Sequence, residues 1–140
     1  MLYSTPEAAE AAFYAAFETR DLAAMMSAWS DDESIACIHP LAAPLNGQAA
    51  VTAGWRSMFE AAGQFLVHVE LMHEIRTDQQ VIRIVSEYLT IGQETEPRPP
   101  ILATNVYQHD HNGWRMVLHH ASPLHVGGTP PTRTPSFVLH

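Results

Sequence analysis

The chain has 140 residues, the length of one domain, and its 46% hydrophobic and 16% charged residues are typical of a globular protein. The formal net charge is −8, from 15 acidic and seven basic residues, and every basic residue is arginine. This balance argues against nucleic acid and anionic membrane surfaces as partners, and the lack of lysine excludes Schiff-base chemistry.

Cysteine content and apolar runs narrow the class of protein further. Cys37 is the only cysteine, which excludes an intrachain disulfide and a zinc site built from four thiolates. The chain has no stretch of about 20 apolar residues, and its start lacks the basic and apolar regions of a signal peptide. We therefore expect a cytoplasmic protein that does not cross or bind a membrane.

The first third of the chain has the residue spacing of amphipathic helices. Thr5 and Pro6 are typical of a helix start, and Asp21 is typical of the residue that caps a second helix. Apolar residues recur at spacings of three and four in both segments: Ala9, Phe13, Ala16 and Phe17, then Leu22, Met25, Met26 and Trp29. A third helix is predicted over 48–62, because Val51, Trp55, Met58 and Phe59 fall on one stripe.

The rest of the chain has the pattern of β-strands. A short strand is predicted over 35–39, followed by a loop over 41–47. Longer strands follow, separated by turns and by a proline-containing segment: 66–76, 81–91, 101–108 and 114–121. Helices followed by consecutive antiparallel strands are the order of an α+β domain, which we expect over 1–125. The Pro- and Gly-rich residues 126–140 predict an irregular tail.

Three short motifs, in this order and spacing, carry a family resemblance. They are Trp29-Ser30-Asp31-Asp32, Cys37-Ile38-His39-Pro40 and His119-His120-Ala121-Ser122-Pro123. Over about residues 5–125 the chain resembles the SnoaL-like branch of the nuclear transport factor 2-like superfamily. The resemblance implies a cone-shaped, curved antiparallel sheet wrapped by three N-terminal helices around a pocket, the cystatin-like α+β barrel.

Two groups within that superfamily imply different functions. The last strand is similar to that of the calcium/calmodulin-dependent kinase II association domain, where the equivalents of His120 and Ser122 line a deep pocket and the domain only assembles subunits. The first strand resembles that of ketosteroid isomerase, whose general base is an aspartate before a proline. Here His39 precedes Pro40, and no counterpart of the isomerase oxyanion hole is identified, so isomerase activity does not follow from the resemblance.

Histidines are the leading candidates for chemistry. His39 can exchange a proton near pH 7, and it ends a strand where it could line a pocket or simply bond to the backbone. His119 and His120 are adjacent on one strand, so their side chains point to opposite faces. The resemblance favours His120 in the pocket and His119 on the convex face, where relatives dimerise.

Aromatic and polar residues complete the predicted pocket. Trp29 and Trp55 lie on helix faces that turn toward the sheet, where a pocket wall and a core coincide. Asn105 and Tyr107 share one strand face and could be polar contacts in an apolar cavity. The family resemblance adds Ser122 to the predicted pocket. Glu87 lies in the middle of a strand, so it is expected to pair with Arg83 or Arg115.

A metal or organic cofactor is not expected. Nine histidines are present, but adjacent strand residues diverge and turn histidines are usually solvated, whereas a metal site needs three or four converging ligands. Neither a glycine-rich phosphate loop nor the G-x-S-x-G motif of hydrolases occurs.

Two functions therefore stay open. In the first, the chain binds a small, largely apolar molecule, with isomerase or lyase chemistry in which His39 moves a proton and His120 or Tyr107 polarises a carbonyl or hydroxyl. In the second, the chain is a non-catalytic module that forms a homodimer through the convex face of its sheet. The second function rests on the segment 81–91, which has apolar residues on both faces.

Overall fold

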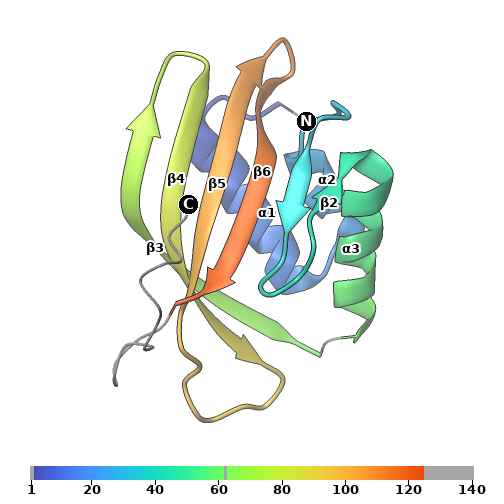
Figure 1. Cartoon of the computed structure of the whole chain (residues 1–140), viewed down its shortest axis with the longest axis vertical. Coiled ribbons are helices and arrows are strands. Elements are labelled where there is room, and N and C mark those ends of the chain that lie inside the picture. The colour runs from blue at the N-terminus through green and yellow to red at the C-terminus, as the bar shows by residue number, and fades with distance from the viewer. Residues whose placement is uncertain (1, 62, 125–140) are drawn as a thin grey trace, which may run out of the picture.

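The computed structural model of the protein describes residues 2–61 and 63–124, and it confirms the α+β class (Figure 1). Its helices are α1 (Pro6–Thr19), α2 (Leu22–Ala28) and α3 (Gly47–Ala61). Its strands are β1 (Ala36–Ile38), β2 (Leu45–Asn46), β3 (Phe65–Arg76), β4 (Gln80–Ile91), β5 (Ile101–Asp110) and β6 (Gly113–Pro123). The predicted tail, 126–140, lies outside the described residues.

Both predicted helix caps are present. The Thr5 side chain accepts a hydrogen bond from the Ala8 amide at 3.0 Å, and the Asp21 carboxylate accepts one from the Ala24 amide at 3.0 Å. Each cap satisfies an amide that has no partner within its helix. Arg20 ends α1 in the left-handed conformation, which lets α2 begin almost at once.

The six strands form one open sheet in the order β2-β1-β6-β5-β4-β3. As predicted, the strands from β3 to β6 are antiparallel to their neighbours. The sequence predicts a wholly antiparallel sheet, and this is wrong in one place: β1 runs parallel to β6. Most of the chain separates these two strands, so no tight hairpin forces them to be antiparallel. The two-residue strand β2 lies within the segment predicted as a loop.

The sheet curves around the helices, which cover its inner face. In Figure 1, α1 crosses behind the sheet and α3 lies beside β1 and β2, while no described helix covers the opposite face. The core between these layers is strongly aromatic, with Phe13, Phe17, Trp29, Trp55 and Tyr107 all buried. Ring contacts join α1 to α3, since the ring centroids of Phe13 and Trp55 lie 5.5 Å apart.

A β-bulge in β6 decides which histidine points inward. Val106 pairs with Leu118 and Tyr107 pairs with Met116, so Val117 is an extra residue in β6. The alternation of faces shifts at that point. The prediction that His120 points inward and His119 outward is therefore wrong: His119 is only 1% exposed and His120 lies on the outer face.

Candidate functional site

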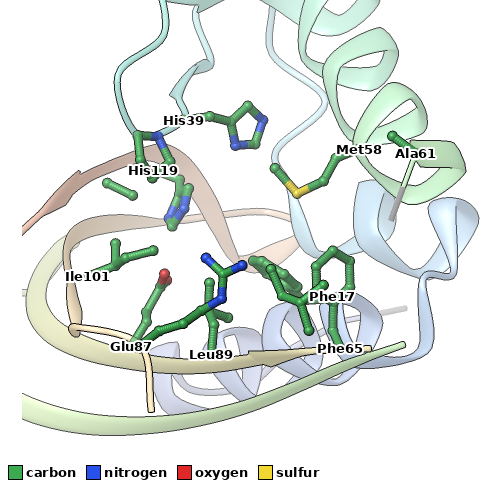
Figure 2. A pocket seen from close by; sticks show the side chains of 13 residues that line it. Phe17, His39, Met58, Ala61, Phe65, Glu87, Leu89, Ile101 and His119 are labelled. Atoms are coloured by element: carbon green, nitrogen blue, oxygen red, sulfur yellow. The ribbon is translucent and has the colours of Figure 1, made fainter. Parts of the chain in front are cut away.

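A cavity of about 380 Å³ opens between the inner face of the sheet and helices α1 and α3 (Figure 2). This volume lies within the range of small-molecule sites. Most of its wall is apolar: Phe17, Pro40, Met58, Ala61, Phe65, Leu89, Ile91, Ile101 and Ala121. The polar residues at the wall are His39, Glu87, Arg98 and His119. A small polar set in an apolar wall is the usual construction of a ligand site.

Glu87 is a buried carboxyl at this wall. It lies in β4 at an inward position, is 2% exposed, and accepts a 2.6 Å hydrogen bond from the Tyr14 hydroxyl at Oε2. Burial raises its pKa to about 7, with Glu10 adding to the rise and the Tyr14 hydrogen bond opposing it. A carboxyl with this pKa can both give and take a proton near neutral pH.

The predicted pairing of Glu87 with an arginine is wrong. Arg83 instead donates to Glu10 through Nε at 2.9 Å and also forms an ion pair with Glu74. Arg115 on β6 donates through Nη1 to the Trp29 carbonyl at 3.5 Å. The pairing fails because the partner of Glu87 is Tyr14, which the fold brings in from α1.

His119 approaches the cavity from β6. Its Nδ1 lies 2.6 Å from Asn105 Oδ1, and the ring packs against Phe13 at 5.0 Å and Trp55 at 6.0 Å between centroids. Burial, together with the neighbouring His39 and His120, lowers the pKa of His119 to about 3. The imidazole is therefore neutral at physiological pH.

Asn105 and Tyr107 lie behind the wall of the cavity, where they bond to α1. The Tyr107 hydroxyl donates to Glu10 Oε2 at 2.6 Å, and Asn105 Nδ2 donates to Glu10 Oε2 at 3.2 Å and to the Tyr14 oxygen at 2.9 Å. This buried network connects β5 to α1, and through Tyr14 it reaches Glu87. It holds the groups that line the cavity in fixed orientations.

His39 lines the cavity at the end of β1. Its Nε2 lies 3.7 Å from the Cys37 sulfur, and its ring meets Trp55 edge-on with centroids 4.7 Å apart. Burial lowers the pKa of His39, so this imidazole too is neutral near pH 7. Of the residues predicted to line a pocket, His39 is the one found at the wall.

The other predicted site residues lie elsewhere. Trp29 and Trp55 are core residues, 1% and 0% exposed. The ring of Trp55 packs edge-on against the ring of His39. His120 and Ser122 are exposed on the outer face of β6, away from the cavity, because of the bulge at Val117.

The cavity includes three polar residues that the sequence did not identify as site residues: Glu87, Arg98 and His119. A signal for Glu87 was present, because Val81, Val85 and Leu89 mark the inward positions of β4 and Glu87 shares their parity. Arg98 belongs to the β4–β5 connection and donates to Glu94 through Nε and Nη2 at 2.7 and 2.6 Å. No local pattern predicts its place at the cavity.

In residues 2–61 and 63–124, no three or more His, Cys, Asp or Glu side chains are grouped so that they could hold a metal ion. Within the same ranges, no helix is both long enough and apolar enough to span a membrane.

A family model for the SnoaL-like domain matches residues 7–125. The chain belongs to the SnoaL-like family. This confirms the resemblance inferred from the three sequence motifs. The bulge in β6 nevertheless places His119 of this member, and not His120, at the cavity.

Solved structures include one with high sequence identity. A protein from Thiobacillus denitrificans, provisionally assigned as a calcium/calmodulin-dependent protein kinase type II association domain, is 67% identical with a TM-score of 0.86, over 89% of this chain and 99% of that one. A provisionally assigned dehydratase of the NTF2-like family from Streptomyces avermitilis is 24% identical, with a TM-score of 0.75 over 84% and 92% of the two chains. The second match shows the fold alone.

A ketosteroid isomerase-like protein from Erwinia carotovora atroseptica also shares the fold, at 16% identity and a TM-score of 0.67 over 86% of this chain and 95% of that one. Among curated proteins, the F-box protein SKIP8 of Arabidopsis thaliana is 29% identical over 114 residues. That match covers 80% of this chain and 46% of SKIP8, so the chain spans less than half the length of this relative.

Proposed function

We propose that the chain binds a small, largely apolar molecule in its cavity and transfers a proton on it, with Glu87 as the acid–base group. The observation that carries this proposal is a carboxyl, 2% exposed, at the wall of an apolar cavity of about 380 Å³. Its Oε2 is occupied by Tyr14, and Oε1 has no partner among the described residues. Such a carboxyl has a proton affinity suited to catalysis near neutral pH.

The chemistry that fits is isomerisation or elimination. The ionised Glu87 takes a proton from a carbon beside a carbonyl, and the resulting carboxylic acid returns it to another atom or loses it to a leaving group. His39, neutral in the folded protein, is a further polar group at the cavity wall and donates a hydrogen bond to the substrate oxygen. The apolar wall keeps water away from the reacting atoms.

The test is a screen of small ketones and hydroxy compounds by thermal shift and by exchange of their C–H protons with deuterated solvent. We expect ligands that stabilise the wild type to exchange with it, and Glu87→Gln to keep binding while exchange falls at least about 100-fold. His39→Ala is expected to weaken both. Full exchange in Glu87→Gln, or the lack of any stabilising ligand in the screen, would contradict the proposal.

A second function, homodimerisation, is favoured by the outer face of the sheet. One cross-strand row carries Ile75, Ile82, Val106 and Leu118 on β3 to β6, opposite one another in register. None of the four is fully buried, and Ile75 is 49% exposed. Burying these branched aliphatic residues against a second copy of the chain removes apolar surface from water, which stabilises the dimer.

Sedimentation velocity at micromolar concentration tests the dimer. We expect the wild type to sediment as a dimer and Val106→Glu to sediment as a folded monomer, with an unchanged circular dichroism spectrum. His111→Glu, which adds the same charge in an exposed turn, is the matched control and is expected to stay dimeric. A monomeric wild type would exclude this function, and the cavity proposal does not depend on it.

A further inference from the structure

Two polar atoms, on side chains that are themselves buried, line the cavity without a protein partner. Glu87 donates nothing and accepts from Tyr14 at Oε2, which leaves Oε1 without a partner among residues 2–61 and 63–124. His119 uses Nδ1 toward Asn105, which leaves Nε2 equally without one. Both side chains are more than nine-tenths buried, and an apolar ligand that filled the cavity without pairing with these two atoms would leave them unsatisfied, at a cost in free energy.

The network behind the wall fixes which of these atoms is a donor and which an acceptor. Glu10 is an acceptor, so the Asn105 side-chain group that contacts it at 3.2 Å is the NH₂ group. Asn105 therefore presents its oxygen to His119, and His119 Nδ1 must carry the proton. Since the ring is neutral, Nε2 is a bare acceptor. The Tyr14 hydroxyl, which accepts from Asn105, donates its own proton to Glu87 Oε2.

The cavity thus offers an acceptor beside a donor. Burial favours the protonated, uncharged form of Glu87. Because Oε2 accepts the hydrogen bond from Tyr14, the carboxyl proton is then on Oε1, where it is available to a ligand. Figure 2 shows the carboxyl of Glu87 and the ring of His119 pointing toward one another from β4 and β6. A ligand that satisfies both atoms must present an acceptor and a donor on neighbouring atoms of its own.

We propose that Glu87 and His119 together recognise an uncharged carboxamide or carboxylic acid group, attached to an apolar body that fills the rest of the cavity. The carbonyl oxygen accepts from Glu87 Oε1, and the N–H or O–H of the same group donates to His119 Nε2. A carboxylate anion is disfavoured at this pair of atoms, because it would place its charge against the lone pair of Nε2. Arg98, the cation that also lines the cavity, is already paired with Glu94. This inference rests on the proposed function only in taking the cavity to hold a small molecule.

Three probes of nearly equal shape test it: benzamide, acetophenone and benzoate. Benzamide has both the acceptor and the donor, acetophenone lacks the donor, and benzoate is an anion at the working pH of 6. By calorimetric or NMR titration of the full chain, we expect benzamide to bind at least about tenfold more tightly than either of the others, since each leaves a buried atom unpaired.

Variants separate this inference from proton transfer. Glu87→Gln retains a donor and the bond from Tyr14, so we expect it to keep the preference for benzamide although it can no longer transfer a proton. Glu87→Leu removes the donor and is expected to abolish the preference. Long-range ¹H–¹⁵N spectra of the wild type are expected to show His119 protonated at Nδ1, with the Nε2 signal shifting when benzamide is added.

Several results would overturn the assignment: equal affinity for benzamide and acetophenone, tighter binding of benzoate, no binding of benzamide at millimolar concentration, or a His119 proton on Nε2. None of these results bears on the solvent exchange experiment with Glu87→Gln, which judges proton transfer by itself. A folded His119→Leu that kept the full preference for benzamide would likewise contradict the assignment.

Discussion

The Tyr14 hydroxyl donates a 2.6 Å hydrogen bond to the carboxyl of Glu87, which lies 73 positions further along the chain. This contact ties α1 to the middle of β4 at the cavity wall. The hydrogen bond favours the ionised carboxyl, yet burial outweighs it and raises the pKa of Glu87 to about 7. Folding therefore makes this carboxyl hold its proton more tightly.

The first prediction concerns Glu87 and the stability of the protein between weak acid and neutral pH. The unfolded chain loses the Glu87 proton near the ordinary pKa of 4.5, whereas the folded chain holds it up to about 7, so stability falls as the pH rises between these values. The loss amounts to about 3 kcal/mol. Glu87→Gln is expected to remove this loss, measured by urea unfolding at pH 5 and pH 8.

The exposed Glu70 on β3 provides the control for this experiment. Glu70→Gln is expected to keep the pH dependence of the wild type. If Glu87→Gln lost as much stability as the wild type between pH 5 and pH 8, the buried carboxyl would not be the titrating group.

The second prediction concerns His119 and acid. The unfolded chain binds a proton at this imidazole near pH 6.5, whereas burial lowers the pKa in the folded state to about 3, so stability is lost as the pH falls between these values. The loss is about 5 kcal/mol over that range. His119→Gln cannot be protonated, so its unfolding free energy should fall less steeply from pH 6.5 to 3. An unchanged slope would show that His119 is not responsible.

The third prediction concerns the buried bond between Tyr107 and Glu10. Tyr107 is fully buried, and its hydroxyl donates to the Glu10 carboxylate at 2.6 Å. Tyr107→Phe is expected to cost about 2 kcal/mol by chemical unfolding, because a hydrogen bond to a charged group is lost. Tyr88→Phe is the matched control: its hydroxyl lies 3.4 Å from Glu70 on an exposed face, and its effect should lie within about 0.5 kcal/mol.

The fourth prediction contrasts two glycines with positive φ. Gly113 has φ 84°, and a Cβ added there would lie 2.7 Å from the carbonyl oxygen of Tyr3. Gly92 has φ 63° and nothing within 4 Å of such a Cβ. Gly92→Ala is expected to cost about 1 kcal/mol from backbone strain, and Gly113→Ala about 3 kcal/mol because Tyr3 must also move. Equal costs by thermal unfolding would show that the contact with Tyr3 is easily displaced.

Local patterns were enough to predict most of the fold. The caps at Thr5 and Asp21 act on amides three residues away, so the sequence alone predicts where α1 and α2 begin. Alternation over 66–76, the β-branched run over 81–91 and the proline and Asn-Gly turn signals that bound the later segments predict the strands from β3 to β6. The strand β2 has two residues, too few to show any alternation, so the sequence pattern predicts a loop there.

The site was harder to predict because it depends on contacts between distant segments. Glu87 was expected to pair with a nearby arginine, but the fold supplies Tyr14 from α1 instead. The orientation of His119 depends on how β6 pairs with β5, which no pattern within β6 shows. His39 was found because the end of a strand before a proline is visible in the sequence.

The extra residue in β6 has a consequence for comparing members of the family. His119 and His120 come shortly after the extra residue Val117. The number of residues between Met116 and this pair determines which of the two imidazoles points into the interior. A relative with the same two histidines but an unbulged strand would expose the other ring to its ligand. Inserting or deleting one residue in β6 can thus change which histidine points inward, even when the neighbouring side chains stay the same.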